Sequence, residues 1–234
     1  MWQCASQASG GSFDVTVAPE LVCRGYLPRP AAPELAPGAS WEDIELLPAC
    51  RVRLRRPLWI DLGGIAKGYA VDAATAALRG VGIGSGLVNA GGDLRAFGDT
   101  AWPVAVRDPA RPGVALRLPE LRNMSLATSA WMSEADDAIG RGPHIDPWRR
   151  QDPPRFASVS VVAATCMMAD ALTKVVMAQG AAAIAVLERF GARALTIGTD
   201  GSVQASSATL LARARPASAG FAGTRHPPAA MVAA

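Results

Sequence analysis

The sequence predicts an α+β fold, in which mixed or antiparallel sheets pack against helices. Half of the 234 residues are hydrophobic, which is enough for a packed core. Short apolar runs typical of strands, a hairpin signal at Asp200-Gly201 and alanine-rich stretches typical of helices follow one another irregularly. Because strands and helices do not alternate strictly, we expect α+β rather than a doubly wound parallel sheet.

Composition divides the chain into four stretches. Residues 27–40 (LPRPAAPELAPGAS) hold too many prolines for a regular element. We therefore expect them to connect a short N-terminal piece, residues 1–26, to a main body, residues 41–214. Residues 215–234 are rich in Pro and Ala, and we expect a disordered tail there.

Local patterns predict the regular elements. Ser40 is a favourable cap for a short helix over Trp41–Leu47. In Arg51–Arg56 the arginines alternate with apolar residues, which is typical of one solvated face of an edge strand. The apolar run Leu58–Leu62 predicts a buried strand. The other expected elements are an alanine-rich helix from Gly63-Gly64 to Gly80, strands at Gly86–Asn89, Pro103–Arg107, Val114–Leu118 and Ser158–Val162, and helices at Cys166–Gln179 and Ala181–Phe190.

Bulk properties exclude several classes of function. A net charge of +3, with no basic stripe interleaved with aromatics, argues against a nucleic-acid partner. No apolar run approaches the roughly 20 residues that cross a bilayer, and the N-terminus has no secretory signal, so we expect a cytoplasmic protein without a membrane span. The four scattered cysteines form no CxxC pair, and we expect buried free thiols.

Lysine and histidine are rare in this chain. Arginine carries almost all the positive charge, and the only lysines are Lys67 and Lys174. Of the two histidines, His226 lies in the tail and His144 in the main body. We hypothesise that Lys and His within the body stand where Arg cannot substitute chemically.

The segment from Asp61 to Asp93 has the pattern of a phosphate site. Asp61 and a glycine pair precede a helix that carries Lys67 one turn in, and a second glycine pair precedes Asp93. Such turns let backbone N–H groups approach a phosphate that the lysine can neutralise. The alternative is that these glycines serve turn geometry only. The intervening GVGIGSG follows a helix and enters a strand, which excludes a dinucleotide fingerprint.

Two further clusters carry candidate chemistry. His144, in the polar loop GPHIDP, is either a structural histidine or a base. Asp170, Thr173 and Lys174 share one face of the predicted helix. An ordinary surface ion pair is the alternative there, but the apolar neighbours indicate a helix that is mostly buried.

In this order, the motifs resemble the ApbE family, the FAD:protein FMN transferases. The matching stretches are GSFDVTVAPEL (Gly11–Leu21), DLGGIAKGYAVD (Asp61–Asp72), LVNAGGDLRAFG (Leu87–Gly98), LATS (Leu126–Ser129), HIDP (His144–Pro147) and SVSVVAATCMMADAL (Ser158–Leu172). The resemblance covers almost the whole chain before the tail.

The resemblance implies an ApbE-like, T-fold-like flavin transferase fold. It also implies a Mg²⁺-assisted transfer of the FMN moiety of FAD to a Thr or Ser hydroxyl of a target flavoprotein, with release of AMP. The residues carried over are Asp61, Lys67, Asn89, Ala90, Gly91, Gly92, Asp93, Ser129 and Ile145 as flavin contacts, Gly64, Asp170 and Thr173 as metal ligands, and His144 as the base.

The chain departs from the family pattern in two places. Lys174 stands where members of the family carry a threonine ligand to the metal, and an ammonium cannot coordinate a cation. One alternative is therefore a non-catalytic FAD-binding protein in which Lys174 replaces the metal. Residues 1–26 look like the remnant of a longer N-terminal part of the ApbE-like domain. An unliganded remnant is then a third reading, and a lost lipoprotein signal would place the protein in the periplasm.

Overall fold

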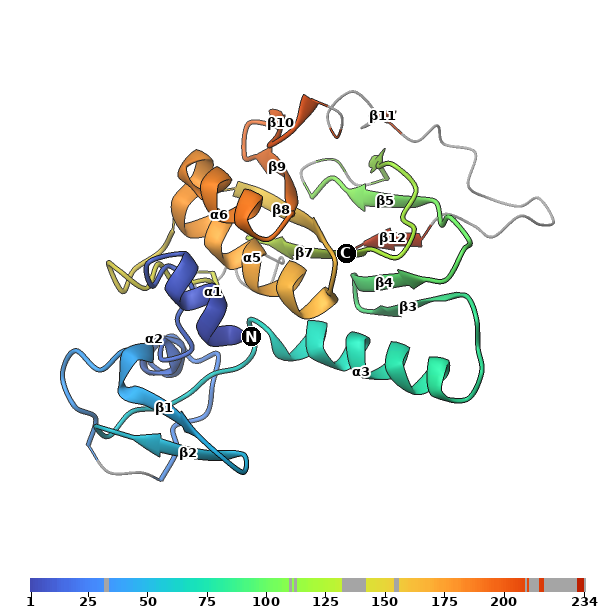
Figure 1. Cartoon of the computed structure of the whole chain (residues 1–234). Coiled ribbons are helices and arrows are strands. Elements are labelled where there is room, and N and C mark those ends of the chain that lie inside the picture. The colour runs from blue at the N-terminus through green and yellow to red at the C-terminus, as the bar shows by residue number, and fades with distance from the viewer. Residues whose placement is uncertain are drawn as a thin grey trace.

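The computed structural model describes residues 1–31, 34–109, 111, 113–131, 142–153, 156–208, 210, 215–216 and 231–233. Within them the fold is α+β, as predicted. Helices cover one face of a central antiparallel sheet, and a smaller sheet covers the other face (Figure 1).

The central sheet has six strands in the order β10-β9-β8-β7-β4-β3, and every neighbouring pair is antiparallel. Alternation along β7 divides the core into two, since Leu126 faces the smaller sheet whereas Ala127 faces the helices. The strands are β3 (Gly86–Ala90), β4 (Asp93–Phe97), β7 (Ser125–Ala130), β8 (Phe156–Ala163), β9 (Arg193–Gly198) and β10 (Val203–Ala205).

The smaller sheet has the order β11-β6-β5-β12, and its side chains of Val104, Val106 and Leu116 pack on the central sheet. Its strands are β5 (Val104–Arg107), β6 (Ala115–Arg117), β11 (Arg215–Pro216) and β12 (Met231–Ala233). Apart from β11 and β12, the predicted disordered tail lies outside the described residues, and that expectation stays a prediction.

Helix α5 (Cys166–Gln179) is the centre of the helical layer and ends where the sequence predicted. Its N-cap Thr165 accepts a hydrogen bond from the Met168 N–H. The turn η2 (Gly180–Ala183) and helix α6 (Ile184–Arg189) continue it. The stretch Cys166–Arg189 is apolar and long enough to cross a membrane, but 61% of its apolar window is buried inside the fold, as in the central helix of a folded core.

Helix α3 (Ala66–Gly80) crosses α5 at very close range. A Cβ on Gly68 would lie 2.4 Å from the Cys166 carbonyl oxygen, so only glycine fits at the crossing. The Asp72 carboxylate of α3 accepts hydrogen bonds from the N–H groups of Cys166 and Met167 and pairs with Arg95. A side chain of α3 therefore helps to cap α5.

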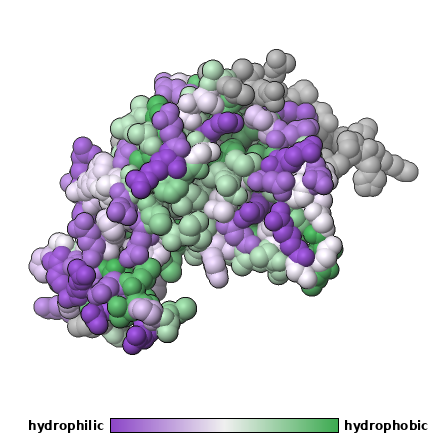
Figure 2. Space-filling view, viewed as in Figure 1, coloured by the Kyte–Doolittle hydropathy of each residue, from purple (hydrophilic) through white to green (hydrophobic). Residues whose placement is uncertain are grey.

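The N-terminal piece forms helices α1 (Trp2–Ala8) and α2 (Ala18–Cys23), and a small hairpin of β1 (Ile44–Leu47) and β2 (Arg51–Leu54) follows. The hairpin stands at one end of the molecule (Figure 1). All four residues of β2 are exposed, in agreement with the predicted solvated edge strand. Apolar Leu46, Val52 and Leu54 lie there among arginines, which gives the mixed surface of Figure 2.

Three local predictions were wrong. The helix expected over Trp41–Leu47 is only the 3-10 turn η1 (Trp41–Asp43), because Ile44–Leu47 gains a strand partner in β2. Leu58–Leu62 forms no strand, and of this run only Leu58 is buried. Of the thiols, Cys166 alone is buried, whereas Cys4, Cys23 and Cys50 are exposed.

Candidate functional site

A cavity of about 430 Å³ opens between the N-terminal segment, the start of α3 and the end of β7. This volume lies within the range of small-molecule sites. The residues that line the cavity come from segments far apart in the sequence: Ser12, Phe13, Asp14, Val17, Leu21, Tyr26, Leu27, Asp61, Gly63, Gly64, Lys67, Thr128, Ser129, Ala130, Pro143, His144, Ile145, Pro147 and Lys174.

The loop before α3 presents Asp61 to the cavity. The Asp61 Oδ1 accepts a hydrogen bond of 2.9 Å from the Gly63 N–H, and the Asp61 N–H donates to the Val15 carbonyl at 2.7 Å. The first contact forms an Asx turn, and the second ties the loop to the N-terminal segment. Together they fix the start of the segment that carries Gly64 and Lys67.

Lys67 links the cavity to a buried carboxylate. Its Nζ lies 3.2 Å from Oδ2 of Asp93, whose side chain is 1% exposed. Burial raises the pKa of Asp93, and the charge of Asp170 raises it further, while Lys67 and Lys174 oppose the shift. Neither oxygen of Asp93 makes a hydrogen bond of good geometry within the described residues. The half-exposed Lys67 is thus the cation that balances Asp93.

A directed chain of hydrogen bonds joins α5 to β7. Lys174 Nζ lies 2.5 Å from Asp170 Oδ1 and donates to Ser129 Oγ at 3.0 Å. Because an ammonium only donates, the Ser129 hydroxyl accepts from it and donates onward to Thr173 Oγ1 at 2.7 Å. The Thr173 hydroxyl donates in turn to the Asp170 carbonyl at 2.7 Å. The other carboxylate oxygen of Asp170 accepts from the Gly68 N–H at 3.2 Å.

His144 lies in the cavity wall with a defined orientation. Its Nε2 is 2.9 Å from the Ala130 carbonyl oxygen, so Nε2 carries a hydrogen and the lone pair of the neutral ring is on Nδ1. The ring lies against Trp131 with centroids 6.3 Å apart. Arg24 donates to the carbonyls of Gly142 and His144, which holds this loop to α2.

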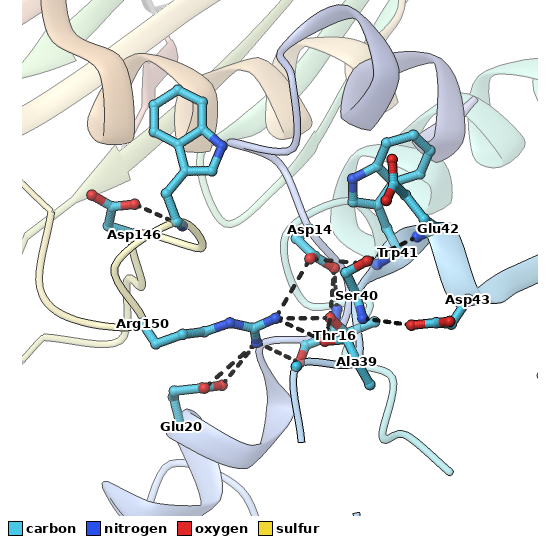
Figure 3. Close-up of polar contacts among 12 residues, drawn as sticks. Asp14, Thr16, Glu20, Ala39, Ser40, Trp41, Glu42, Asp43, Asp146 and Arg150 are labelled. Carbon is cyan, nitrogen blue, oxygen red and sulfur yellow. Dashed lines mark hydrogen bonds and ion pairs between the residues drawn. The ribbon is translucent and has the colours of Figure 1, made fainter. Parts of the chain in front are cut away.

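Arg150 ties the loop after His144 to the N-terminal segment (Figure 3). Its guanidinium donates to the carbonyls of Thr16 and Ala39 at 3.0 Å each, and to Glu20 at 3.3 Å. Asp14, which lines the cavity, holds Thr16 through its N–H and its hydroxyl at 2.8 Å each. The Arg150 contacts join residues more than 100 positions apart and fix two walls of the cavity to one another.

The structure brings together most of the residues singled out from the sequence. Asp61, Gly64, Lys67, Ser129, His144 and Ile145 line the cavity, and Asp170 and Thr173 lie directly behind Ser129 and Lys174. The turn Asn89, Ala90, Gly91 and Gly92 does not line it. There the Asn89 side chain accepts from the Gly92 N–H and closes the β3–β4 hairpin, so that only Asp93 reaches the site, through Lys67.

Sequence reasoning missed the N-terminal wall and its anchor. Ser12, Phe13 and Asp14 line the cavity, and Arg150 holds the segment that carries them. The stretch GSFD already stood among the matching motifs, and this was the one signal that pointed to Asp14. No sequence signal pointed to Arg150, because the chain contains many arginines and the partners of Arg150 are distant in sequence.

The predicted metal ligands do not fit a divalent cation as they are arranged. Within the described ranges, no group of three His, Cys, Asp or Glu side chains gathers. Asp170 is occupied by the Lys174 ammonium and the Gly68 N–H, and the Thr173 hydroxyl oxygen accepts a hydrogen bond from Ser129. Mg²⁺ is usually held by one or two carboxylates together with waters and phosphate oxygens, and here the predicted carboxylate ligand, Asp170, is already paired with an ammonium.

A family model described as "ApbE family" matches residues 3–196. The chain belongs to the ApbE family. The chain is 27% identical over 192 residues to the FAD:protein FMN transferase of Haemophilus influenzae, with 72% of this chain and 55% of that protein covered. For the Vibrio cholerae protein of the same name the identity is 29%, with 73% of this chain and 56% of that protein covered. For that of Rhodobacter capsulatus it is 35% over 154 residues, with 63% and 29% covered. The present chain thus spans about half the length of the Haemophilus influenzae and Vibrio cholerae proteins.

Solved ApbE structures share the fold. The flavin transferase ApbE from Vibrio cholerae aligns with a TM-score of 0.72 at 26% identity, with 89% of this chain and 73% of that chain covered. The ApbE protein from Thermotoga maritima aligns with a TM-score of 0.74 at 25% identity, with 92% and 75% covered. The expected ApbE-like flavin transferase fold is confirmed.

Proposed function

We propose that this chain transfers the FMN moiety of FAD to a Thr or Ser hydroxyl of a target flavoprotein and releases AMP. The observation that carries the proposal is the convergence of Lys67, Lys174 and His144 on one cavity. The names of the relatives supply the substrate, FAD, and the class of acceptor, a protein.

The geometry suits a phosphoryl transfer that relies on positioning and charge. The acceptor oxygen attacks the phosphorus on the FMN side of the pyrophosphate, a new P–O bond forms, and the P–O bond to AMP breaks. His144 is the candidate base that takes the proton of the acceptor hydroxyl, and the Ala130 carbonyl orients its ring through Nε2. The lysine ammonium groups offset the phosphate charge, and Asp61 and Ser129 orient the substrate. The Mg²⁺ assistance expected from the resemblance has no fitting ligand set among these residues.

The test is flavin transfer to an acceptor that a relative already modifies. The protein is incubated with FAD and the acceptor of the Vibrio cholerae enzyme, and covalent FMN is detected by in-gel fluorescence and mass spectrometry. The Vibrio cholerae enzyme is the positive control, and His144→Ala is the matched loss-of-base variant. Covalent FMN that depends on His144 supports the proposal. If the control enzyme labels the acceptor and this chain does not, with or without Mg²⁺, the proposal is overturned for this acceptor class.

FAD binding without transfer is the second candidate. The observation that favours it is the Lys174–Asp170 contact at 2.5 Å, which places a monovalent cation where the family carries a metal ligand. Quenching of FAD fluorescence measures binding alone. Tight binding combined with absent transfer would select this candidate over the first.

A further inference from the structure

We propose that Lys174 is the built-in cation of this cavity, so that the site binds a phosphate of FAD without a divalent ion. This inference rests on the proposed function for the identity of the ligand. The inference identifies the positively charged side chain that the protein itself places beside the phosphate.

The first support is the position of the ammonium among the predicted cation ligands. Lys174 Nζ contacts Asp170 Oδ1 at 2.5 Å and Ser129 Oγ at 3.0 Å. Its aliphatic stem packs on Gly64, where an added Cβ would lie 3.4 Å from Lys174 Cε. Of the predicted metal ligands, Asp170 therefore holds this nitrogen directly, and Gly64 lies beside the stem that carries it.

The second support is that an ammonium and a metal exclude one another here. Mg²⁺ binds carboxylate oxygens at about 2.0–2.1 Å. An ion on Asp170 Oδ1 would share that oxygen with Lys174 and would lie less than about 5 Å from its positive charge. The lysine side chain is 22% exposed, so water screens this repulsion only in part.

The third support is the position of the lysines in the chain. Of the 23 basic residues counted as Lys and Arg, only Lys67 and Lys174 are lysines, and both line this cavity. Each pairs with a carboxylate that is 1% exposed, Asp93 or Asp170. A compact ammonium with three donors can contact a carboxylate, a hydroxyl and a phosphate oxygen at once, and the first two contacts are already present.

The primary experiment measures metal binding without FAD, so that it does not depend on the ligand. Mn²⁺ serves as the probe for a divalent site, and free Mn²⁺ is followed by electron paramagnetic resonance. The wild-type chain is expected to show no measurable binding of Mn²⁺ at this site. Lys174→Thr, which restores an oxygen ligand and removes the ammonium, is expected to bind one ion per chain, with a dissociation constant at least roughly tenfold below the highest Mn²⁺ concentration at which the wild type shows no binding. Lys174→Met removes the charge without adding a ligand and is the matched control.

The second measurement is FAD affinity in EDTA and in Mg²⁺. Wild-type binding is expected to be equal in the two buffers, whereas Lys174→Thr should bind weakly in EDTA and regain affinity in Mg²⁺. Arg53→Met removes an exposed positive charge that does not line the cavity and controls for net charge. Circular dichroism confirms that each variant is folded.

The outcomes separate the two proposals. Equal Mn²⁺ affinity of the wild type and Lys174→Thr overturns the inference, whatever FAD does. A wild type whose FAD affinity rises at least roughly tenfold with Mg²⁺ also overturns it, and leaves FAD as the ligand. Mn²⁺ binding by Lys174→Thr alone, with no FAD bound by any variant, supports the role of Lys174 as the cation but overturns FAD as the ligand.

Discussion

The backbone N–H of Gly68 donates a hydrogen bond of 3.2 Å to Oδ2 of Asp170. This contact joins the first turn of α3 to the buried carboxylate that holds Lys174, where Gly68 lies against the backbone of Cys166 and Met167. The fit between the helices and the arrangement of the cavity therefore depend on the same glycine.

Gly68→Ala is expected to destabilise the protein. The added Cβ would lie 2.4 Å from the Cys166 carbonyl oxygen and 2.6 Å from Met167 Cα, and backbone cannot move aside as a side chain can. The free energy of unfolding, measured by urea denaturation, should fall by about 1–3 kcal/mol. Gly80→Ala is the matched control, because nothing lies within 4 Å of its added Cβ and alanine favours helix. An equal loss in both variants would contradict the close crossing.

Asp72→Ala is expected to loosen the start of α5. The carboxylate accepts from two N–H groups of the first turn of α5 and pairs with Arg95, so its removal leaves helix donors unsatisfied. A loss of about 2 kcal/mol in unfolding free energy is expected. Asp72→Asn keeps one acceptor oxygen and should lose less. Amide hydrogen exchange at Cys166 and Met167 should speed up in Asp72→Ala, and unchanged exchange there would argue against this cap.

Asp93→Asn is expected to stabilise the protein at neutral pH. Burial and the charge of Asp170 raise the pKa of Asp93 in the folded state, so the folded chain holds this proton more tightly than the unfolded chain. Stability therefore declines as the pH rises from the ordinary value of 3.8 through the raised pKa. The variant lacks this decline and should show a higher Tm at pH 7 but not at pH 3. The exposed Asp99→Asn controls for net charge, and a lower Tm for Asp93→Asn at pH 7 would refute the prediction.

Thiol labelling should distinguish Cys166 from the other three cysteines. Burial raises the pKa of the Cys166 thiol far above its ordinary value, and the side chain is inaccessible, so it neither ionises nor meets reagent. Ellman's reagent is expected to label three thiols in the native protein and four in guanidinium chloride. Rapid labelling of four in the native state would show that α5 is not packed as described.

Capping residues and apolar periodicity correctly predicted those elements that depend on residues close together in the sequence. Helix α5 follows a capping threonine and has a long apolar pattern. Its predicted bounds match the observed ones because the cap and the buried apolar residues indicate the same helix. The helix predicted to include Ile44–Leu47 was wrong because these residues form a strand by pairing with β2. The strand predicted at Leu58–Leu62 was wrong because apolar character alone does not supply a strand partner. In the site, Lys67 and Asp61 belong to one short motif and were found. Arg150 and Asp14 depend on contacts across more than 100 residues, which leave no periodic signal in the sequence.

The walls of the cavity have a consequence for synthesis of the protein. Gln179, at the end of α5, donates 2.9 Å hydrogen bonds to the Ser9 carbonyl and the Ser12 hydroxyl, and Arg150 binds the Thr16 carbonyl. The segment Ser9–Thr16 therefore gains these partners only after residues more than 130 positions later have been synthesised. A chain that ends before α5 lacks the Gln179 contacts to Ser9 and Ser12, so this wall of the cavity is completed only once α5 has been made.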